Sequence, residues 1–286
     1  MKTIKNPVHN HLRPKKKFPH IWCPGCSHGI TSGAVIRAID KSGYNPESVV
    51  LVSGIGCASR MPVYFNFNSL HTTHGRPIAF ATGVKASRPE LKVVVITSDG
   101  DGTAIGGNHF IHAARRNIDL TVILYNNHVY GMTGGQFSPT TPSHAYAATA
   151  PWGNYDPMFD ICKLAIGSGA TFVARGSATN AVLLQSYIEK ALKHKGFSLV
   201  EVMSFCPSVY SFYNKAGNGP KMLMDLRDNL ITVAKAKELR EKGETVDKVE
   251  IGILHEVEAP EFVDTYRKFA GKEQKPFSLH LTTLDL

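Results

Sequence analysis

Residues 92–102 read KVVVITSDGDG, an aliphatic run that ends in alternating aspartate and glycine. The β-branched residues from Lys92 to Thr97 favour a short buried strand. Two carboxylates, Asp99 and Asp101, follow the strand directly. In a parallel sheet, polar ligands collect at the carboxyl ends of the strands, because the crossover helices begin there and aim their backbone amides at anions. This stretch therefore predicts an α/β fold with a polar site at one edge of the sheet.

Strand and helix patterns alternate on both sides of this stretch, which predicts a doubly wound, mostly parallel sheet covered by helices. The aliphatic segments predict strands at 48–52, 92–97, 121–125, 171–174 and 197–202, and the helical periodicity predicts helices at 27–42, 103–117 and 181–194.

The composition changes near residue 210, where the chain becomes charged, helical and weakly patterned. We interpret residues 1–209 as the main domain and residues 210–286 as a C-terminal extension that packs on this domain or on a partner. Residues 136–157 are too irregular for a helix or strand, and we expect them to form a functional loop.

The chain has 286 residues, of which 43% are hydrophobic and 19% charged, as in soluble globular proteins. No apolar run approaches the roughly 18 residues of a membrane span, and the basic, polar N-terminus does not resemble a secretory signal. We therefore expect a cytoplasmic protein. The net charge is +9, but its basic clusters at 13–17 and 235–248 accompany no nucleic-acid motif. A solvated surface, or a face for an acidic electron carrier, accounts for this charge without nucleic acid.

Asn127 follows the strand predicted at 121–125, so it falls on the same sheet edge as Asp99. Magnesium prefers hard oxygen ligands, and one aspartate, one asparagine and a backbone carbonyl suit it when substrate phosphates supply the rest. Gly100 and Gly102 would let the backbone approach such phosphates closely. Asp101 stands in a competing Asp-Gly frame and is the alternative ligand.

Four of the five cysteines are placed to share a site. Cys23 and Cys26 form a Cys-x-x-Cys pair, which in a reducing compartment indicates metal binding or redox chemistry rather than a disulfide. Cys57 and Cys206 each follow a predicted strand and so reach the edge that carries Asp99. The spacing leaves zinc, a redox dithiol and an iron-sulfur cluster open. Cys162 is predicted to be a buried apolar residue.

Taken together, these motifs resemble the β subunits of the 2-oxoacid:ferredoxin oxidoreductases over residues 10 to 215. The matching segments are WCPGC at 22–26, GIGC at 54–57, HTTHGR at 71–76, DGD at 99–101, NN at 126–127, YGMT at 130–133 and FCP at 205–207.

The resemblance implies a thiamine diphosphate held through Mg²⁺, with Asp99, Asn127 and the carbonyl of Val129 as ligands. It favours Asp99 over Asp101, because related enzymes use the first aspartate, although Ser98 replaces the usual first glycine of the motif. It also implies that Cys23, Cys26, Cys57 and Cys206 bind one 4Fe-4S cluster. The residues expected to line the thiamine cofactor are Ile55, Gly56, Cys57, Ala58, His74, Gly100, Asp101, Gly131 and Met132, with His71 and Arg76 as neighbouring candidates of open role.

The function implied by the resemblance is the coenzyme A-dependent oxidative decarboxylation of a 2-oxoacid, with electrons passed through the cluster to ferredoxin. The glutamate that activates thiamine is expected on a separate α subunit, so this chain is expected to act in a heterodimer or heterotetramer. Residues 21–26 and 131–136 resemble those of 2-oxoglutarate-type members, which favours conversion of 2-oxoglutarate to succinyl-CoA and CO₂. The alternatives are pyruvate or a branched-chain 2-oxoacid, a non-redox thiamine decarboxylase subunit with structural zinc, and a noncatalytic zinc-binding interaction protein.

Overall fold

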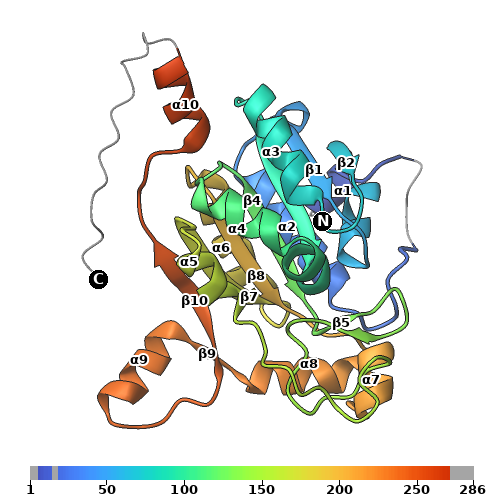
Figure 1. The fold of residues 1–286 in the computed structure, drawn as a ribbon. Helices are drawn as coiled ribbons and strands as arrows, with labels where there is room; N and C mark the ends of the chain where they lie inside the picture. Colours follow the sequence, from blue (N-terminus) through green and yellow to red (C-terminus); the bar gives the residue numbers. More distant parts are fainter. Residues whose placement is uncertain (1–5, 15–18, 271–286) are drawn as a thin grey trace, which may run out of the picture.

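The computed structural model describes residues 6–14 and 19–270. Its main feature in this part of the chain is an eight-stranded sheet in the order β2-β1-β3-β4-β8-β7-β10-β9 (Figure 1). All neighbouring strands from β2 to β7 run parallel. The predicted doubly wound α/β fold is thus confirmed. The strands are β1 (Val49–Ser53), β2 (Asn68–His71), β3 (Lys92–Ser98), β4 (Thr121–Asn126), β7 (Phe172–Ser177), β8 (Ser198–Met203), β9 (Leu230–Thr232) and β10 (Val249–Glu256), with a separate hairpin of β5 (Val129–Tyr130) and β6 (Gln136–Phe137).

The central strands are buried on both faces, since every residue of β1, β4 and β8 is buried. Strands in this position read as continuous aliphatic runs rather than as alternating ones. This is why the sequence located all five predicted strands to within one residue at the start and three at the end.

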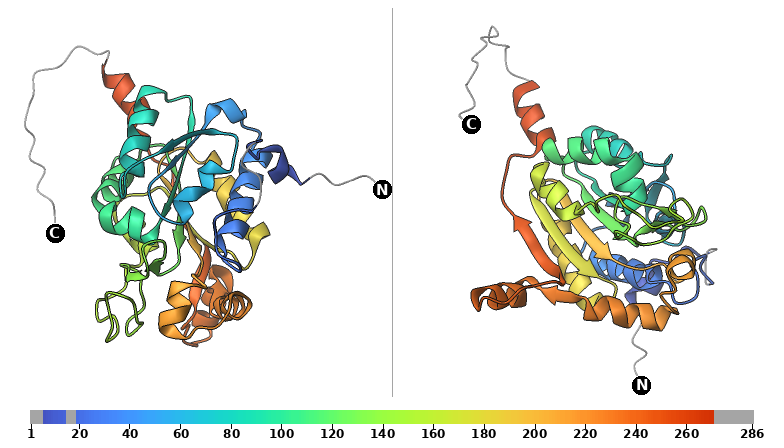
Figure 2. Two further views of the ribbon diagram at one scale, coloured as in Figure 1. Left: turned by 90° about the vertical axis from the view of Figure 1, so that its right-hand side faces the viewer. Right: turned by 60° about the horizontal axis from the view of Figure 1, so that its bottom comes forward.

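Helices cover both faces of the sheet (Figures 1 and 2). One hydrophobic core joins α2 and α6 to the sheet, and a second core joins α3, α4 and α5 to the opposite face. The helices are α1 (Pro7–Asn10), α2 (His28–Lys41), α3 (Pro77–Ser87), α4 (Gly107–Arg115), α5 (Ile161–Gly167), α6 (Ala181–Lys193), α7 (Val209–Asn214), α8 (Gly219–Asp228), α9 (Val233–Glu241) and α10 (Phe262–Ala270).

The helix predicted at 103–117 is divided in two. A π-helical turn spans Gly100–Ile105, and α4 begins only at Gly107. Within the turn, the N–H of Gly106 donates to the carbonyl of Asp101 at 3.1 Å, and a Cβ at Gly106 would lie 2.6 Å from that oxygen. Glycine is required for this approach. Such turns often mark functional sites, and this one follows the strand that carries Asp99.

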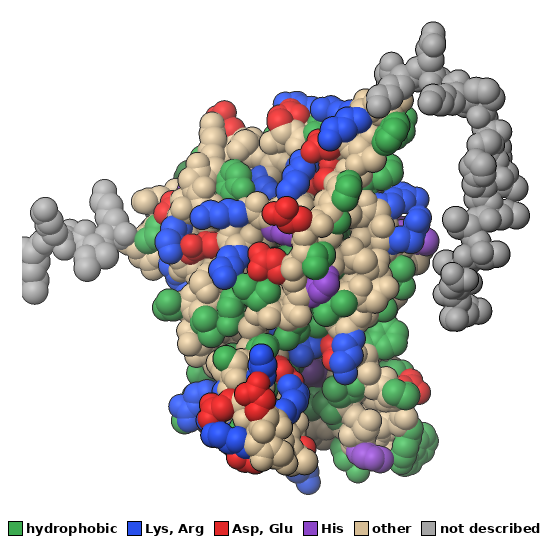
Figure 3. Space-filling model, turned by 90° about the vertical axis from the view of Figure 1, so that its left-hand side faces the viewer, with side chains coloured by type: hydrophobic (Ala, Val, Ile, Leu, Met, Phe, Trp, Pro, Cys, Tyr) green, Lys and Arg blue, Asp and Glu red, His purple; other side chains and the backbone are tan. Residues whose placement is uncertain are grey.

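The C-terminal extension adds strands to the main sheet. β10 pairs antiparallel with β7, and β9 pairs with β10, so this part of the extension is joined to the main sheet through backbone hydrogen bonds. Residues 271–286 of the predicted extension lie outside the described residues. Cations and anions are interspersed on the face shown in Figure 3, and in α9 the side chain of Glu238 pairs with both Lys235 and Lys242. No helix in the described ranges has the length and apolar character needed to cross a bilayer.

A buried ion pair links α3 to the segment before β4. Asp119 Oδ2 lies 2.6 Å from Lys85 Nζ, and Asp119 Oδ1 lies 3.7 Å from Lys92 Nζ. Burial by itself would raise the pKa of Asp119, but the lysine charges outweigh it, and the net pKa is lowered. The carboxylate therefore stabilises the folded state while it is ionised.

We expect Asp119→Ala to lower the free energy of unfolding at pH 7 by about 3–5 kcal/mol, because it leaves Lys85 buried without its partner. Because the pKa of Asp119 is lowered in the folded state, the stabilisation by its carboxylate is complete above the unfolded pKa of about 4. This stabilisation is lost as the pH falls through the pKa of the folded state. Urea unfolding from pH 7 to pH 3, with the exposed Asp247→Ala as a matched control, measures this. A stability difference between Asp119→Ala and the wild type that does not shrink toward pH 3 contradicts the account.

Candidate active site

A small cavity of about 30 Å³ at the carboxyl edge of the sheet brings together most of the predicted cofactor residues. Gly100 and Asp101 were predicted to line the same site, but they lie buried beside it. A Cβ at Gly100 would overlap the ring of Tyr130, which covers this residue. The cavity is lined by His28, Ile55, Gly56, Cys57, Ala58, His74, Ser98, Asn127, Val129, Tyr130, Gly131, Met132 and Thr133.

Three oxygens converge beside this cavity. Asn127 Oδ1 lies 3.3 Å from Asp99 Oδ1 and 2.8 Å from the carbonyl oxygen of Val129. If the amide is turned over, Nδ2 donates to both oxygens; in the orientation described, three acceptors face one another. Oxygens at right angles around Mg²⁺, each about 2.1 Å from the ion, are about 3 Å apart. These three residues therefore fit part of an octahedral magnesium shell.

Two hydroxyl groups hold the carboxylate of Asp99 from the other side. Ser138 Oγ donates to Asp99 Oδ2 at 2.6 Å, and Thr140 Oγ1 lies 2.8 Å from the same oxygen. Burial is the main cause that raises the pKa of Asp99, which these hydroxyls oppose. Residues 136–157 were predicted to form a functional loop. No sequence motif indicated Ser138 or Thr140, because no local pattern relates them to Asp99.

Asp101 is fully buried and its carboxylate joins three segments of the chain. It accepts hydrogen bonds from Ile55 N at 3.1 Å, Gly75 N at 2.8 Å and Thr97 Oγ1 at 2.6 Å. A Cβ at Gly54 would overlap this carboxylate, so glycine is required there. Because these donors already occupy Asp101, the geometry favours Asp99 as the metal ligand.

Of the three candidates in the HTTHGR segment, His74 lines the cavity. Its Nδ1 lies 2.6 Å from Asp101 Oδ1, and 30% of the side chain is exposed. Arg76 is exposed and contacts His109, whereas His71 contacts Ser53 Oγ. Of these three candidates, His74 is therefore the one that lines the cavity.

The four predicted cysteine ligands line an adjoining cavity of about 270 Å³. All four are free thiols. Burial is the main cause that raises the pKa of Cys26 to about 12 and that of Cys57 to about 11. Among the described residues, no three His, Cys, Asp or Glu side chains converge closely enough to hold one ion. The cavity that the four cysteines line, together with eight further residues, has room for a multi-atom group.

Two further residues contact these cysteines: His28, which the sequence did not single out, and Trp22, which belongs to the matching segment at 22–26. His28 is buried, and its Nδ1 lies 3.3 Å from Cys26 Sγ. Burial lowers the pKa of His28 to about 4. Trp22 Nε1 donates to the carbonyl of Cys57 at 2.8 Å. The position of His28, two residues after the Cys-x-x-Cys pair, is the one feature of the sequence that could have indicated its contact with Cys26.

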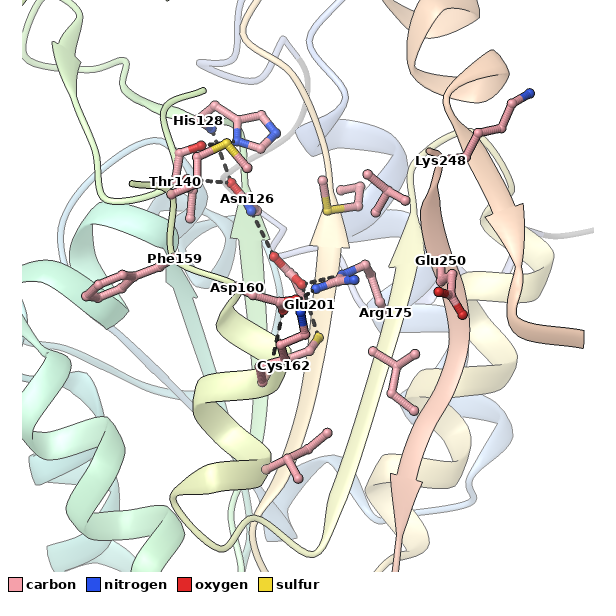
Figure 4. A pocket seen from close by; sticks show the side chains of 16 residues that line it. Asn126, His128, Thr140, Phe159, Asp160, Cys162, Arg175, Glu201, Lys248 and Glu250 are labelled. Carbon is pink, nitrogen blue, oxygen red and sulfur yellow. Dashed lines mark hydrogen bonds and ion pairs between the residues drawn. The ribbon is translucent and has the colours of Figure 1, made fainter. Parts of the chain in front are cut away.

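A third cavity, of about 460 Å³, opens beside β10 (Figure 4). At its base the buried Glu201 accepts hydrogen bonds from Arg175 Nε at 2.6 Å and Asn126 Nδ2 at 2.8 Å. The thiol of Cys162 donates to the same carboxylate at 3.1 Å, so this cysteine is buried, as expected, but hydrogen-bonded. Glu201 is thus engaged in a buried ion pair and belongs to a different cavity from His74.

Known proteins share both the domain and most of the chain. A family model described as the C-terminal TPP binding domain of thiamine pyrophosphate enzymes matches residues 54–202. The 2-oxoglutarate synthase subunit KorB of Methanocaldococcus jannaschii is 48% identical over 93% of this chain and 98% of its own length. The 2-oxoacid:ferredoxin oxidoreductase subunit beta of Saccharolobus solfataricus is 44% identical over 68% of this chain and 64% of the relative.

This chain belongs to the 2-oxoacid:ferredoxin oxidoreductase β subunits. A solved structure titled as the 2-oxoglutarate:ferredoxin oxidoreductase of Magnetococcus marinus, with 2-oxoglutarate, coenzyme A and succinyl-CoA bound, aligns with a TM-score of 0.81. It is 31% identical and the match covers 96% of this chain and 94% of that chain. The predicted family, the thiamine diphosphate-binding fold and the role as a subunit of an oxidoreductase are therefore confirmed.

Proposed function

We propose that this β subunit, together with an α subunit, converts 2-oxoglutarate and coenzyme A to succinyl-CoA and CO₂ and passes two electrons to ferredoxin through a 4Fe-4S cluster. The proposal rests mainly on the observation that the thiamine site and the cysteine site share a wall at Gly131. A Cβ at Gly131 would lie 3.5 Å from Cys206 Sγ, 3.8 Å from Cys57 Sγ and 4.0 Å from Asn127 Nδ2. An electron donor and an electron acceptor held there would be neighbours.

Mg²⁺ would be held by Asp99, Asn127 and the carbonyl of Val129, where the oxygens have the spacing of an octahedral shell. When bound there by its diphosphate, thiamine supplies the electron sink for decarboxylation. The residues of this chain position that group and exclude water around it. Tyr130 contributes by closing over Gly100, whose carbonyl accepts a hydrogen bond from the tyrosine hydroxyl at 3.0 Å.

The cluster would be held by Cys23, Cys26, Cys57 and Cys206. Thiolate ligands suit iron-sulfur clusters and zinc alike. The volume of the cavity that the four cysteines line, about 270 Å³, favours the cluster, because a single zinc ion draws all of its sulfur ligands to about 2.3 Å from one point. The cluster also supplies one-electron chemistry, which zinc does not.

An α subunit is required to complete the thiamine site. The cavity on this chain measures about 30 Å³, whereas small-molecule sites usually measure roughly 300–1,000 Å³. We propose that the α subunit supplies the remaining walls and the activating glutamate, in a heterodimer or heterotetramer in the cytoplasm. The names of several relatives support 2-oxoglutarate as the substrate; pyruvate or a branched-chain 2-oxoacid is the alternative.

Anaerobic co-purification with the α subunit, followed by ferredoxin reduction assays, tests this function. We expect reduction that needs 2-oxoglutarate, coenzyme A and thiamine diphosphate together, with kcat/KM at least about tenfold higher than for pyruvate. The β subunit alone should be inactive. A preference for pyruvate would contradict the substrate assignment, and thiamine-dependent CO₂ release without ferredoxin reduction would support the non-redox alternative.

A further inference from the structure

The buried Asp101 and the partly exposed His74 form a carboxylate–imidazole pair beside the thiamine cavity. Asp101 is inaccessible to solvent, and its Oδ1 lies 2.6 Å from His74 Nδ1. The carboxylate is itself fixed by the N–H groups of Ile55 and Gly75 and by the hydroxyl of Thr97. A pair held this firmly fixes the orientation of the imidazole ring.

This contact also sets the tautomer of His74. An ionised carboxylate only accepts hydrogen bonds, so Nδ1 must carry a proton when it contacts Asp101 Oδ1. In the neutral ring, Nε2 is then unprotonated and available as a base. The ring of Tyr130 packs edge-on against His74, with centroids 6.0 Å apart, and holds the ring from a second side.

Four of the described residues that line this cavity can titrate, and three of them are already engaged. His28 is buried against Cys26, and Cys57 is a proposed cluster ligand. The hydroxyl of Tyr130 donates to the carbonyl of Gly100 at 3.0 Å. His74 remains as the base of the cavity.

The proposed reaction needs a base at one defined step. Coenzyme A enters as a thiol and leaves as a thioester, so its S–H bond must break. We propose that His74, oriented by Asp101, takes the proton of the coenzyme A thiol. This inference rests on the proposed function.

In that step the thiol proton moves to His74 Nε2, and the sulfur forms a bond to the acyl carbon. The bond between the acyl carbon and the cofactor breaks, and its electron pair remains on the cofactor. His74 then returns the proton to solvent. The two electrons pass one at a time through the cluster to ferredoxin, the acceptor in the proposed function, so no further oxidant is needed.

Stopped-flow measurements on the anaerobic αβ complex separate the steps before and after the thiol enters. Mixing with 2-oxoglutarate alone reports cluster reduction, and adding coenzyme A together with oxidised ferredoxin reports the thiol-dependent step. For His74→Gln we expect the first rate to stay within about twofold and the second to fall roughly 100- to 1,000-fold, in line with a lost acid–base group.

Asp101→Asn supplies a second variant that keeps the shape of the pair, and its amide oxygen still faces the N–H groups of Ile55 and Gly75 and Nδ1 of His74. The negative charge that stabilises the protonated imidazole is lost, so the thiol-dependent step should fall, by less than in His74→Gln. Nitrogen NMR of histidine-labelled complex gives a readout that is independent of turnover. The Nδ1–H signal of His74 should be lost in His74→Gln and retained in Asp101→Asn and in His112→Gln, a matched change at an exposed residue of α4.

A normal thiol-dependent rate in His74→Gln would overturn the inference, and so would an equal loss of the first rate, which would place His74 in cofactor binding instead. Loss of thiamine binding in Asp101→Asn would show that Asp101 is a magnesium ligand and would also overturn it. A wild-type complex that no 2-oxoacid reduces contradicts the proposed function itself, and with it this role of His74. These outcomes are distinguishable.

Discussion

Asp99→Ala should weaken the magnesium-dependent binding of thiamine diphosphate to the αβ complex by more than about 100-fold. Even outer partners of metal ligands contribute roughly 10- to 100-fold to metal affinity, and Asp99 is the carboxylate among the three converging oxygens. Isothermal titration with thiamine diphosphate at several magnesium concentrations measures the loss. The iron content and the visible absorption of the cluster should not change, because Asp99 is not among the residues that line the cysteine cavity.

Asp99→Asn controls for misfolding as a cause of lost binding, because asparagine keeps the volume of this fully buried side chain, which Ser138 and Thr140 contact. It should also lose affinity, because the charge is removed. Asp156→Ala, a matched change at an exposed aspartate of the same edge loop, should bind as the wild type does. Tight thiamine binding in both Asp99 variants would move the magnesium ligand to Asp101.

Cys206→Ala should remove the cluster, with a fall in iron from about four atoms per chain to below about one. Each thiolate of a 4Fe-4S cluster holds one iron, and Cys206 shares its cavity with the other three cysteines. Iron analysis and electron paramagnetic resonance after anaerobic purification measure this. The reduced-cluster signal should disappear as well.

Cys162→Ala is the matched control, because Cys162 lies in a different cavity and donates to Glu201. It should retain the full iron content and signal. If Cys206→Ala keeps four irons while Cys162→Ala loses them, the assignment of the ligands is wrong.

The parallel core could be predicted because its strands are buried on both faces and therefore form unbroken aliphatic runs. β10 was missed for the opposite reason. It is half exposed, charged residues interrupt its pattern, and its register shifts between Ile253 and His255. No sequence pattern in β10 indicates that this strand pairs with β7. The packing of the extension on the sheet therefore could not be predicted, because it depends on tertiary contacts.

Asp99 and Asn127 could be predicted as neighbours because both follow adjacent parallel strands, whose carboxyl ends must meet. The roles of Asp101 and His74 could not be assigned, since their contact spans 27 residues and depends on the π-helical turn. Ser138, Thr140 and His28 were missed for a similar reason. Their roles arise from where loops are packed rather than from spacing along the chain.

The central claim is that a redox cluster shares a wall with the thiamine site. The most direct test is anaerobic purification of the αβ complex, followed by metal analysis of this chain and electron paramagnetic resonance before and after dithionite. The account predicts about four irons per β subunit from this site and a signal that appears on reduction. One zinc per chain, with no signal in either state, would contradict it.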